Sequence, residues 1–160
     1  MSSSISSLSL RKSVNMKRHL HELGSFVGRS VTADELEDVA ATNKIKEGQL
    51  GFSVFELVRF EIPFSQKTDK RFKEFIERLT AANPASIYLW TAHATDCGAL
   101  KLGSLSSVNF DFSFDASEQS LFSLLTTDFA DRMLLEFHEE SGRQILVIEV
   151  QGKHWSSIRF

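Results

Sequence analysis

The sequence predicts an α+β fold, a single-domain sandwich in which helices pack on a mostly antiparallel sheet. Three observations predict this class. Helical and strand-like segments alternate so that strands occur in adjacent runs between helices. Residues 107–115, "SVNFDFSFD", alternate between apolar and polar side chains, as a strand with one wet face does. Residues 131–152 contain two strand-like segments around a glycine turn.

The first predicted helix lies in "SVTADELEDVAATNKIKEG". Thr32 and Glu35 have the spacing of a capping box, and Gly48 ends the helix. A strand is expected over residues 52–62, which are rich in Val, Phe and Ile, and Pro63 stops its hydrogen-bond ladder.

The segment "TDKRFKEFIERLTAANP" gives the clearest helix of the chain, with Thr68 as its expected cap. Four apolar residues fall at i, i+3, i+4 and i+7 and so share one side: Phe72, Phe75, Ile76 and Leu79. "SIYLW" follows as a buried strand. Residues 92–104 show no apolar period and are expected to form a loop.

The second half of the chain is predicted to be mainly strands. After the alternating strand at 107–115, Asp115 and Glu118 repeat the capping-box spacing and predict a short helix that carries three leucines. "DRMLLEFHEESGRQILVIEVQG" predicts a β-hairpin, and "KHWSSIRF" a last short strand.

The chain divides into a serine-rich, basic N-terminal tail at residues 1–21 and a single domain at residues 22–160. The tail is expected to be flexible, with Met16 as the alternative natural start. Its composition is also that of an organellar transit peptide, and an adaptor that docks through this tail is a further alternative.

Composition excludes several classes of function. The chain has 14 phenylalanines, which are expected to fill a core. Residues 22–160 carry 14 basic and 21 acidic side chains, and this balance disfavours a nucleic-acid-binding domain but suits a basic protein partner. The longest apolar runs are far too short to span a bilayer. A single cysteine cannot form an intramolecular disulfide, which suits the cytoplasm.

That cysteine, Cys97, lies close to His93 and Asp96 in "TAHATDCGAL". A thiol enzyme needs a base in reach of the sulfur and a device that lowers the thiol pKa. Neighbours in one loop rarely meet both needs, so we favour a non-enzymatic protein. The alternative is a small cysteine-dependent enzyme that uses Cys97 and His93.

No cofactor or metal is expected. The histidines match no metal-ligand spacing, and the chain contains neither phosphate-binding glycine motif. Carboxylates crowd the segment "TTDFADRMLLEFHEES". They are either a solvated hairpin end, which is the favoured interpretation, or a patch that meets a basic surface. The candidate partner-binding residues are Asp128, Asp131, Glu136, Glu139, Glu140 and Trp155. Trp155 is included because an exposed Trp is a frequent interface anchor, although a Trp at the edge of the core is the commoner outcome.

With its acidic body, its single α+β domain and the closing hairpin "LLEFHEESGRQILVIEVQGKHW", the chain resembles in general style the small cytosolic immunity proteins that bacteria pair with secreted or contact-dependent toxins. The resemblance implies a protein that sequesters the active domain of a cognate toxin, often a nuclease, by blocking its active surface. No motif of that class can be transferred to particular residues.

Overall fold

The fold is described from a computed structural model of the chain. The structure describes residues 2–160, with side chains from residue 13 onward. Its helices are α1 (Ser2–Val27), α2 (Val39–Gly48), α3 (Lys70–Ala82) and α4 (Ala94–Cys97). Its strands are β1 (Val58–Pro63), β2 (Ile87–Trp90), β3 (Leu100–Leu102), β4 (Leu121–Thr126), β5 (Asp131–Glu140) and β6 (Arg143–Gly152). Four 3-10 helices connect them: η1 (Ala33–Glu35), η2 (Gln49–Val54), η3 (Phe64–Thr68) and η4 (Leu105–Ser107).

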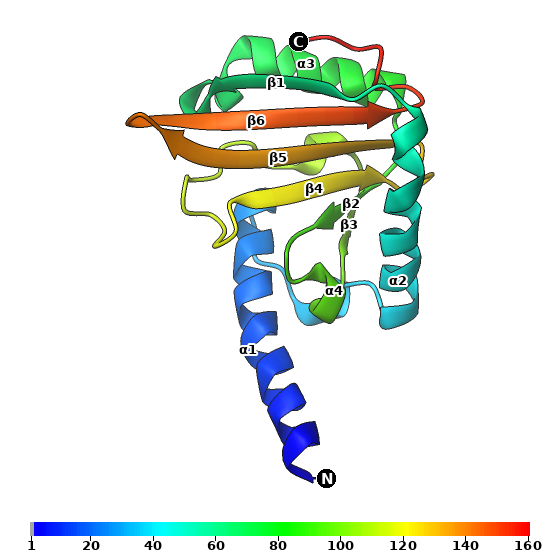
Figure 1. Cartoon of the computed structure of the whole chain (residues 1–160), viewed down its shortest axis with the longest axis vertical. Coiled ribbons are helices and arrows are strands. Elements are labelled where there is room, and N and C mark those ends of the chain that lie inside the picture. The colour runs from blue at the N-terminus through cyan, green and yellow to red at the C-terminus, as the bar shows by residue number, and fades with distance from the viewer. Residues whose placement is uncertain (1) are drawn as a thin grey trace.

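The strands form one six-stranded sheet in the order β1-β6-β5-β4-β2-β3, and every neighbouring pair is antiparallel (Figure 1). The predicted hairpin is confirmed, because β5 and β6 pair along their full length from Asp131–Gly152 to Glu140–Arg143. The α+β class is therefore confirmed, with helices packed on an antiparallel sheet.

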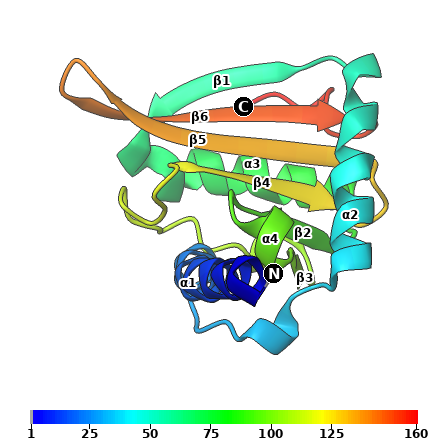
Figure 2. The ribbon, with the colours of Figure 1, turned by 60° about the horizontal axis from the view of Figure 1, so that its bottom comes forward.

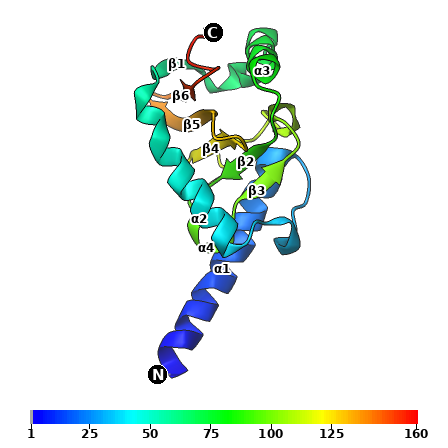
Figure 3. The same cartoon turned by 90° about the vertical axis from the view of Figure 1, so that its right-hand side faces the viewer.

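The two faces of the sheet are covered unequally. Helix α3 lies along one face, which we call the back face, while α2 crosses one end of the opposite face, which we call the front face (Figures 2 and 3). The apolar positions of α3 predicted to share one side are all buried against the back face. The second half of α1 also packs there through Leu23 and Phe26, which are fully buried.

Phenylalanine rings form the centre of the back-face core. Eight of the 14 phenylalanines are buried, as expected from their abundance. The contacts among Phe26, Phe64, Phe112, Phe122 and Phe137 have ring-centroid distances between 3.9 and 5.6 Å. Aromatic rings at such separations contribute beyond the apolar area that they bury. The elements that supply these rings are consequently held together on the back face.

The prediction of a strand at residues 107–115 is wrong. This segment runs over the back-face core without joining the sheet, and its Asn109 N–H donates to the carbonyl of Phe26 at 2.7 Å. Phe112 is buried while Asp111 and Ser113 are exposed. The alternation therefore reflects a segment with one side on the core and one in water, which an irregular chain satisfies as well as a strand does.

The short helix predicted after Asp115 is also wrong, because residues 121–126 form β4 in the middle of the sheet. A central strand with both faces covered has a nearly continuous apolar run, and such a run does not distinguish strand from helix. The expected strand in "KHWSSIRF" is absent as well, since residues 153–157 form turns.

The helix predicted from Thr32 begins later than expected. The capping box of Thr32 and Glu35 is present, but it closes the 3-10 turn η1. Leu36 then forms an isolated bridge with Leu100, and Asp38 caps α2 by accepting from the Ala41 N–H at 2.8 Å. Similarly, the strand expected over residues 52–62 starts only at Val58, because residues 49–54 form η2.

Three smaller differences concern element ends. Asp69 occupies the cap position of α3 in place of Thr68. The loop expected at residues 92–104 contains α4 and β3. Helix α1 crosses the boundary expected at residue 21, and His19 within it is fully buried. Within residues 2–160, no helix combines the length and apolar character needed to cross a membrane.

Candidate functional site

The acidic residues predicted to form one patch are separated by the length of a strand. Asp128 and Asp131 lie at one end of β5, and Glu139 and Glu140 lie at the other. At about 3.3 Å per residue, a ten-residue strand separates these ends by about 30 Å. The five carboxylates thus do not form a single patch.

Asp131 is not a surface residue, which corrects its assignment to the binding patch. It is fully buried, and its carboxylate accepts four hydrogen bonds. Oδ1 accepts from the backbone N–H groups of His154 and Trp155 at 2.8 and 2.9 Å. Oδ2 accepts from Asn83 Nδ2 and interacts with His154 Nδ1, both at 2.8 Å. Gly152 lies against it so closely that a Cβ there would strike Asp131 and the Ala130 carbonyl.

This network joins the start of β5, the end of α3 and the C-terminal segment. The Asp131–His154 pair has the geometry of the acid and base of a hydrolase, but the far nitrogen of His154 has no hydroxyl or thiol partner among residues 13–160. We interpret the network as structural, because each of its bonds fixes one chain segment on another.

Trp155 is also buried, so its assignment as an exposed anchor is wrong. Its ring is fully inaccessible, and Nε1 donates to the Leu79 carbonyl at 3.0 Å. This carbonyl is in the last turn of α3 and also accepts from the backbone N–H of Asn83, the C-cap residue, at 3.0 Å. Trp155 therefore fastens the C-terminal segment to α3.

The structure places Cys97, His93 and Asp96 in and beside one short helix. Cys97 is buried and is the last residue of α4. His93 precedes the same short helix, and Asp96 is exposed beside it. The three sequence neighbours therefore lie in and beside one helical turn.

A buried histidine that sequence reasoning missed lies beside this turn. His19 of α1 bonds through Nε2 to the Gly98 carbonyl at 2.7 Å and through Nδ1 to Thr91 Oγ1 at 2.9 Å. Because a carbonyl only accepts, Nε2 carries the proton, and the neutral ring then accepts from the Thr91 hydroxyl at Nδ1. Burial lowers the pKa of His19, the bond to Gly98 partly offsets this, and the nearby His93 lowers it further.

The free energy of unfolding should therefore fall as the pH drops below about 6.5, the ordinary pKa of histidine. The unfolded chain binds a proton at His19 more readily than the folded chain, so acid favours unfolding, with a slope of at most about 1.4 kcal/mol per pH unit for one proton. Urea denaturation of the wild type and His19→Gln between pH 5 and 7 measures this. The variant should show a smaller pH slope, and equal slopes would contradict the role of His19.

Most of the front face of the sheet is not covered by a helix. In Figure 1 the front of β1, β6 and β5 is open over most of its length, and α2 crosses only one end. Residues paired across an antiparallel sheet share a face, so the strand register defines the rows of side chains on the front face. One row is Glu61–Val147–Glu136–Leu121, and the next is Arg59–Glu149–Leu134–Ser123–Trp90. We call these two rows the open face.

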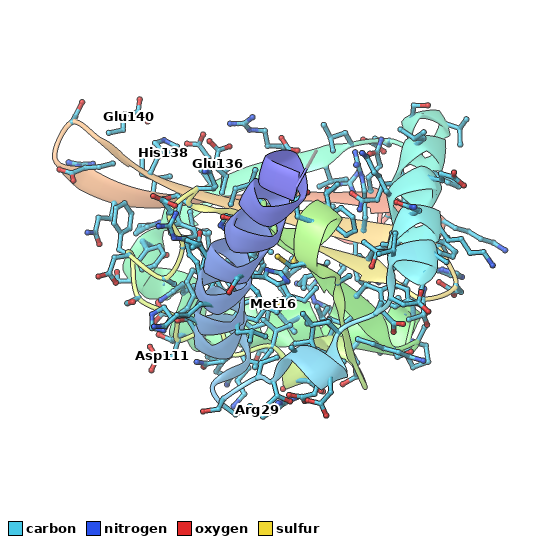
Figure 4. All side chains as sticks on the ribbon, turned by 90° about the horizontal axis from the view of Figure 1, so that it is seen from below. Met16, Arg29, Asp111, Glu136, His138 and Glu140 are labelled. Carbon is cyan, nitrogen blue, oxygen red and sulfur yellow. The ribbon has the colours of Figure 1, made fainter. Side chains whose placement is uncertain are left out.

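The open face is acidic around a small apolar centre. It carries Glu61, Glu136 and Glu149 against a single cation, Arg59, which bridges Glu61 at 3.6 Å and Glu149 at 3.4 Å. Among residues 13–160, Glu136 has no basic partner. Figure 4 shows Glu136 with His138 and Glu140 on one side of the β5–β6 hairpin, with Asp111 on the other side of the sheet.

A cavity adjoins the apolar end of the open face. It has a volume of about 230 Å³ and lies between Gln49 at the start of η2 and the sheet residues Trp90, Leu121 and Leu134. Leu121 is 38% exposed, which is unusual for a leucine of a central strand. A cavity of this size beside a half-exposed leucine can accept one large side chain of a partner.

Of the predicted binding residues, the structure thus brings only Glu136 onto the open face, with Glu140 beyond its end. Glu139 points to the opposite side, because side chains alternate along a strand. The sequence did not predict the residues that β1, β4 and β6 contribute to the open face. Only the strand register identifies them.

Metal chemistry finds no support in the part of the chain with described side chains, where His, Cys, Asp and Glu form no group able to hold an ion. Comparison of the chain with protein-family models, with curated proteins and with solved structures finds no match.

Proposed function

We propose that this protein is a non-enzymatic binding protein that covers a basic surface of another protein, most concretely as an immunity protein that neutralises a cognate toxin. The observation that carries the proposal is the open face: an uncovered, acidic sheet surface with an apolar centre. Complementary charge speeds encounter and fixes the orientation of the partners. The cavity beside Leu121 supplies a place for an anchoring side chain.

The acidic excess of residues 22–160 supports a basic partner, and the general style of the chain agrees with the immunity class. An active domain that handles nucleic acid is itself basic, because it must bind phosphates. An acidic sheet face held over such a domain would exclude its substrate by charge and by bulk.

Expression together with the adjacent open reading frame tests the proposal. We expect the two products to co-purify, and we expect this chain to protect cells from the other product. The absence of both association and protection for every neighbouring gene product would refute the toxin partner.

Glu136→Lys tests the surface. We expect the association rate constant for a basic partner to fall about tenfold at low salt and to depend less on salt, because a steering charge has been reversed. Stopped-flow or surface-plasmon-resonance kinetics over a salt series measures this. Glu74→Lys is the matched control, since Glu74 is an exposed residue of α3 on the other side of the sheet. Equal effects of the two variants would remove the open face as the interface.

A further inference from the structure

A second cavity lies on the opposite side of the sheet, between α3 and the irregular segment at residues 106–111. Its volume is about 370 Å³, within the range of pockets that hold small ligands. The apolar part of its wall consists of Phe72 and Ile76 from α3 with Val108 and Phe110 from the segment. The two elements contact each other beside the cavity, where the ring centroids of Phe72 and Phe110 are 5.2 Å apart.

One lysine of this wall is buried. Lys67 is only 5% exposed, and it is one of the residues that line the cavity. Its position follows from the geometry of η3, because side chains at i and i+3 of a 3-10 helix are eclipsed. Lys67 therefore stacks on Phe64, with Nζ 4.1 Å from the ring centroid, and lies 5.0 Å from the Phe112 centroid.

The ammonium group of Lys67 has aromatic neighbours but no anion bound to it. Within residues 13–160, no carboxylate forms an ion pair or hydrogen bond with Nζ. Burial lowers the pKa of Lys67, and the charge of Asp111 across the cavity partly offsets this. A buried lysine is normally paired, because an uncompensated charge is costly to remove from water.

We propose that the cavity between α3 and residues 106–111 binds a small organic acid, with its carboxylate on Lys67 and its apolar body against Phe72, Ile76, Val108 and Phe110. A single negative charge matches the single buried ammonium. The charged residues that line the cavity are Lys67 and Lys73 against Glu77 and Asp111, so its formal charge is zero. A phosphate dianion fits less well than a monoanion, because the lining has no net positive charge to match a second negative charge.

Titration with phenylacetate and 4-phenylbutyrate, each against its matching alcohol, tests the proposal by NMR of the ¹⁵N-labelled full chain. We expect a carboxylate to shift the amide signals of residues 67–77 and 106–111 at concentrations up to about 10 mM, and to bind about tenfold more tightly than the alcohol. Binding of neither acid, equal binding of acid and alcohol, or shifts confined to other residues would overturn the proposal.

Lys67→Met separates charge from shape. Methionine keeps an unbranched side chain over Phe64 and removes the buried charge, so the variant should fold. It should lose about tenfold in affinity for the acids while its affinity for the alcohols is unchanged. Lys70→Met is the matched control, because Lys70 is 90% exposed and outside the cavity. An equal loss in both variants would refute the role of Lys67. The comparison of acid with alcohol on the wild type does not depend on either variant.

This test is independent of the proposed function. The cavity and the open face are on opposite sides of the sheet, so Lys67→Met should leave partner association unchanged, and Glu136→Lys should leave acid binding unchanged.

Discussion

Replacement of Asp131 by alanine should lower the free energy of unfolding by about 3 to 5 kcal/mol, since it removes a fully buried acceptor that serves four donors at once. Two of these donors are backbone N–H groups of the C-terminal segment, and one belongs to Asn83 at the end of α3. The buried N–H of Trp155 would lose its acceptor, while Asn83 would keep only its longer bonds to Asp128. Chemical denaturation monitored by circular dichroism measures the loss.

Asp128→Ala is the matched control for this substitution. Asp128 is exposed, receives longer bonds of 3.3 Å from Asn83, and accepts from the Ala130 N–H at 3.1 Å. Its loss should cost no more than about 1 kcal/mol. Asp131→Asn should fall between the two, because the amide keeps one acceptor oxygen and places an NH₂ group opposite the remaining donors. Similar destabilisation by Asp131→Ala and Asp128→Ala would show that the buried network contributes little.

Trp155→Ala should destabilise the protein by about 3 to 5 kcal/mol, the usual cost of truncating a fully buried aromatic side chain. Trp155→Phe retains most of the buried area but loses the Nε1–H bond to the Leu79 carbonyl, so about 1 to 2 kcal/mol is expected. Thermal and urea unfolding of both variants check the order.

Phe129→Ala provides the comparison for Trp155, since Phe129 is 39% exposed and should contribute much less. The same variants also test the earlier expectation that Trp155 anchors a partner. Because Trp155 is buried, we expect the folded Trp155→Phe variant to bind a partner with the same affinity as the wild type. A selective loss of binding with unchanged stability would restore Trp155 to the interface.

The sequence predicts the fold best where the apolar pattern has one interpretation. The i, i+3, i+4, i+7 spacing from Phe72 to Leu79 and the glycine turn between β5 and β6 both gave correct elements. The apolar pattern gives a wrong prediction where it fits more than one structure. Phe112 is buried in an irregular segment, and Phe122 and Leu124 belong to a strand whose apolar run also suits a helix.

The candidate site was less predictable, because it depends on register and burial. Asp131 and Glu136 are similar in sequence context, yet one is fully buried beneath the C-terminal segment and the other faces solvent. The difference arises from Asn83 and His154, which are distant in sequence. Likewise, the pairing of β1 with β6 and of β4 with β5 brings Glu61 and Leu121 into one row, which no local pattern shows.

The two outer strands of the sheet restrict how other chains can approach it. One border is β1, which ends in Pro63, a residue without an N–H to donate, and presents Arg59 and Glu61. The other border is the three-residue β3, where Leu36 already bridges Leu100. Neither border is a long apolar template for a further strand. Growth of the sheet into fibres and capture of an extended peptide by backbone pairing are both disfavoured, so recognition is left to side chains.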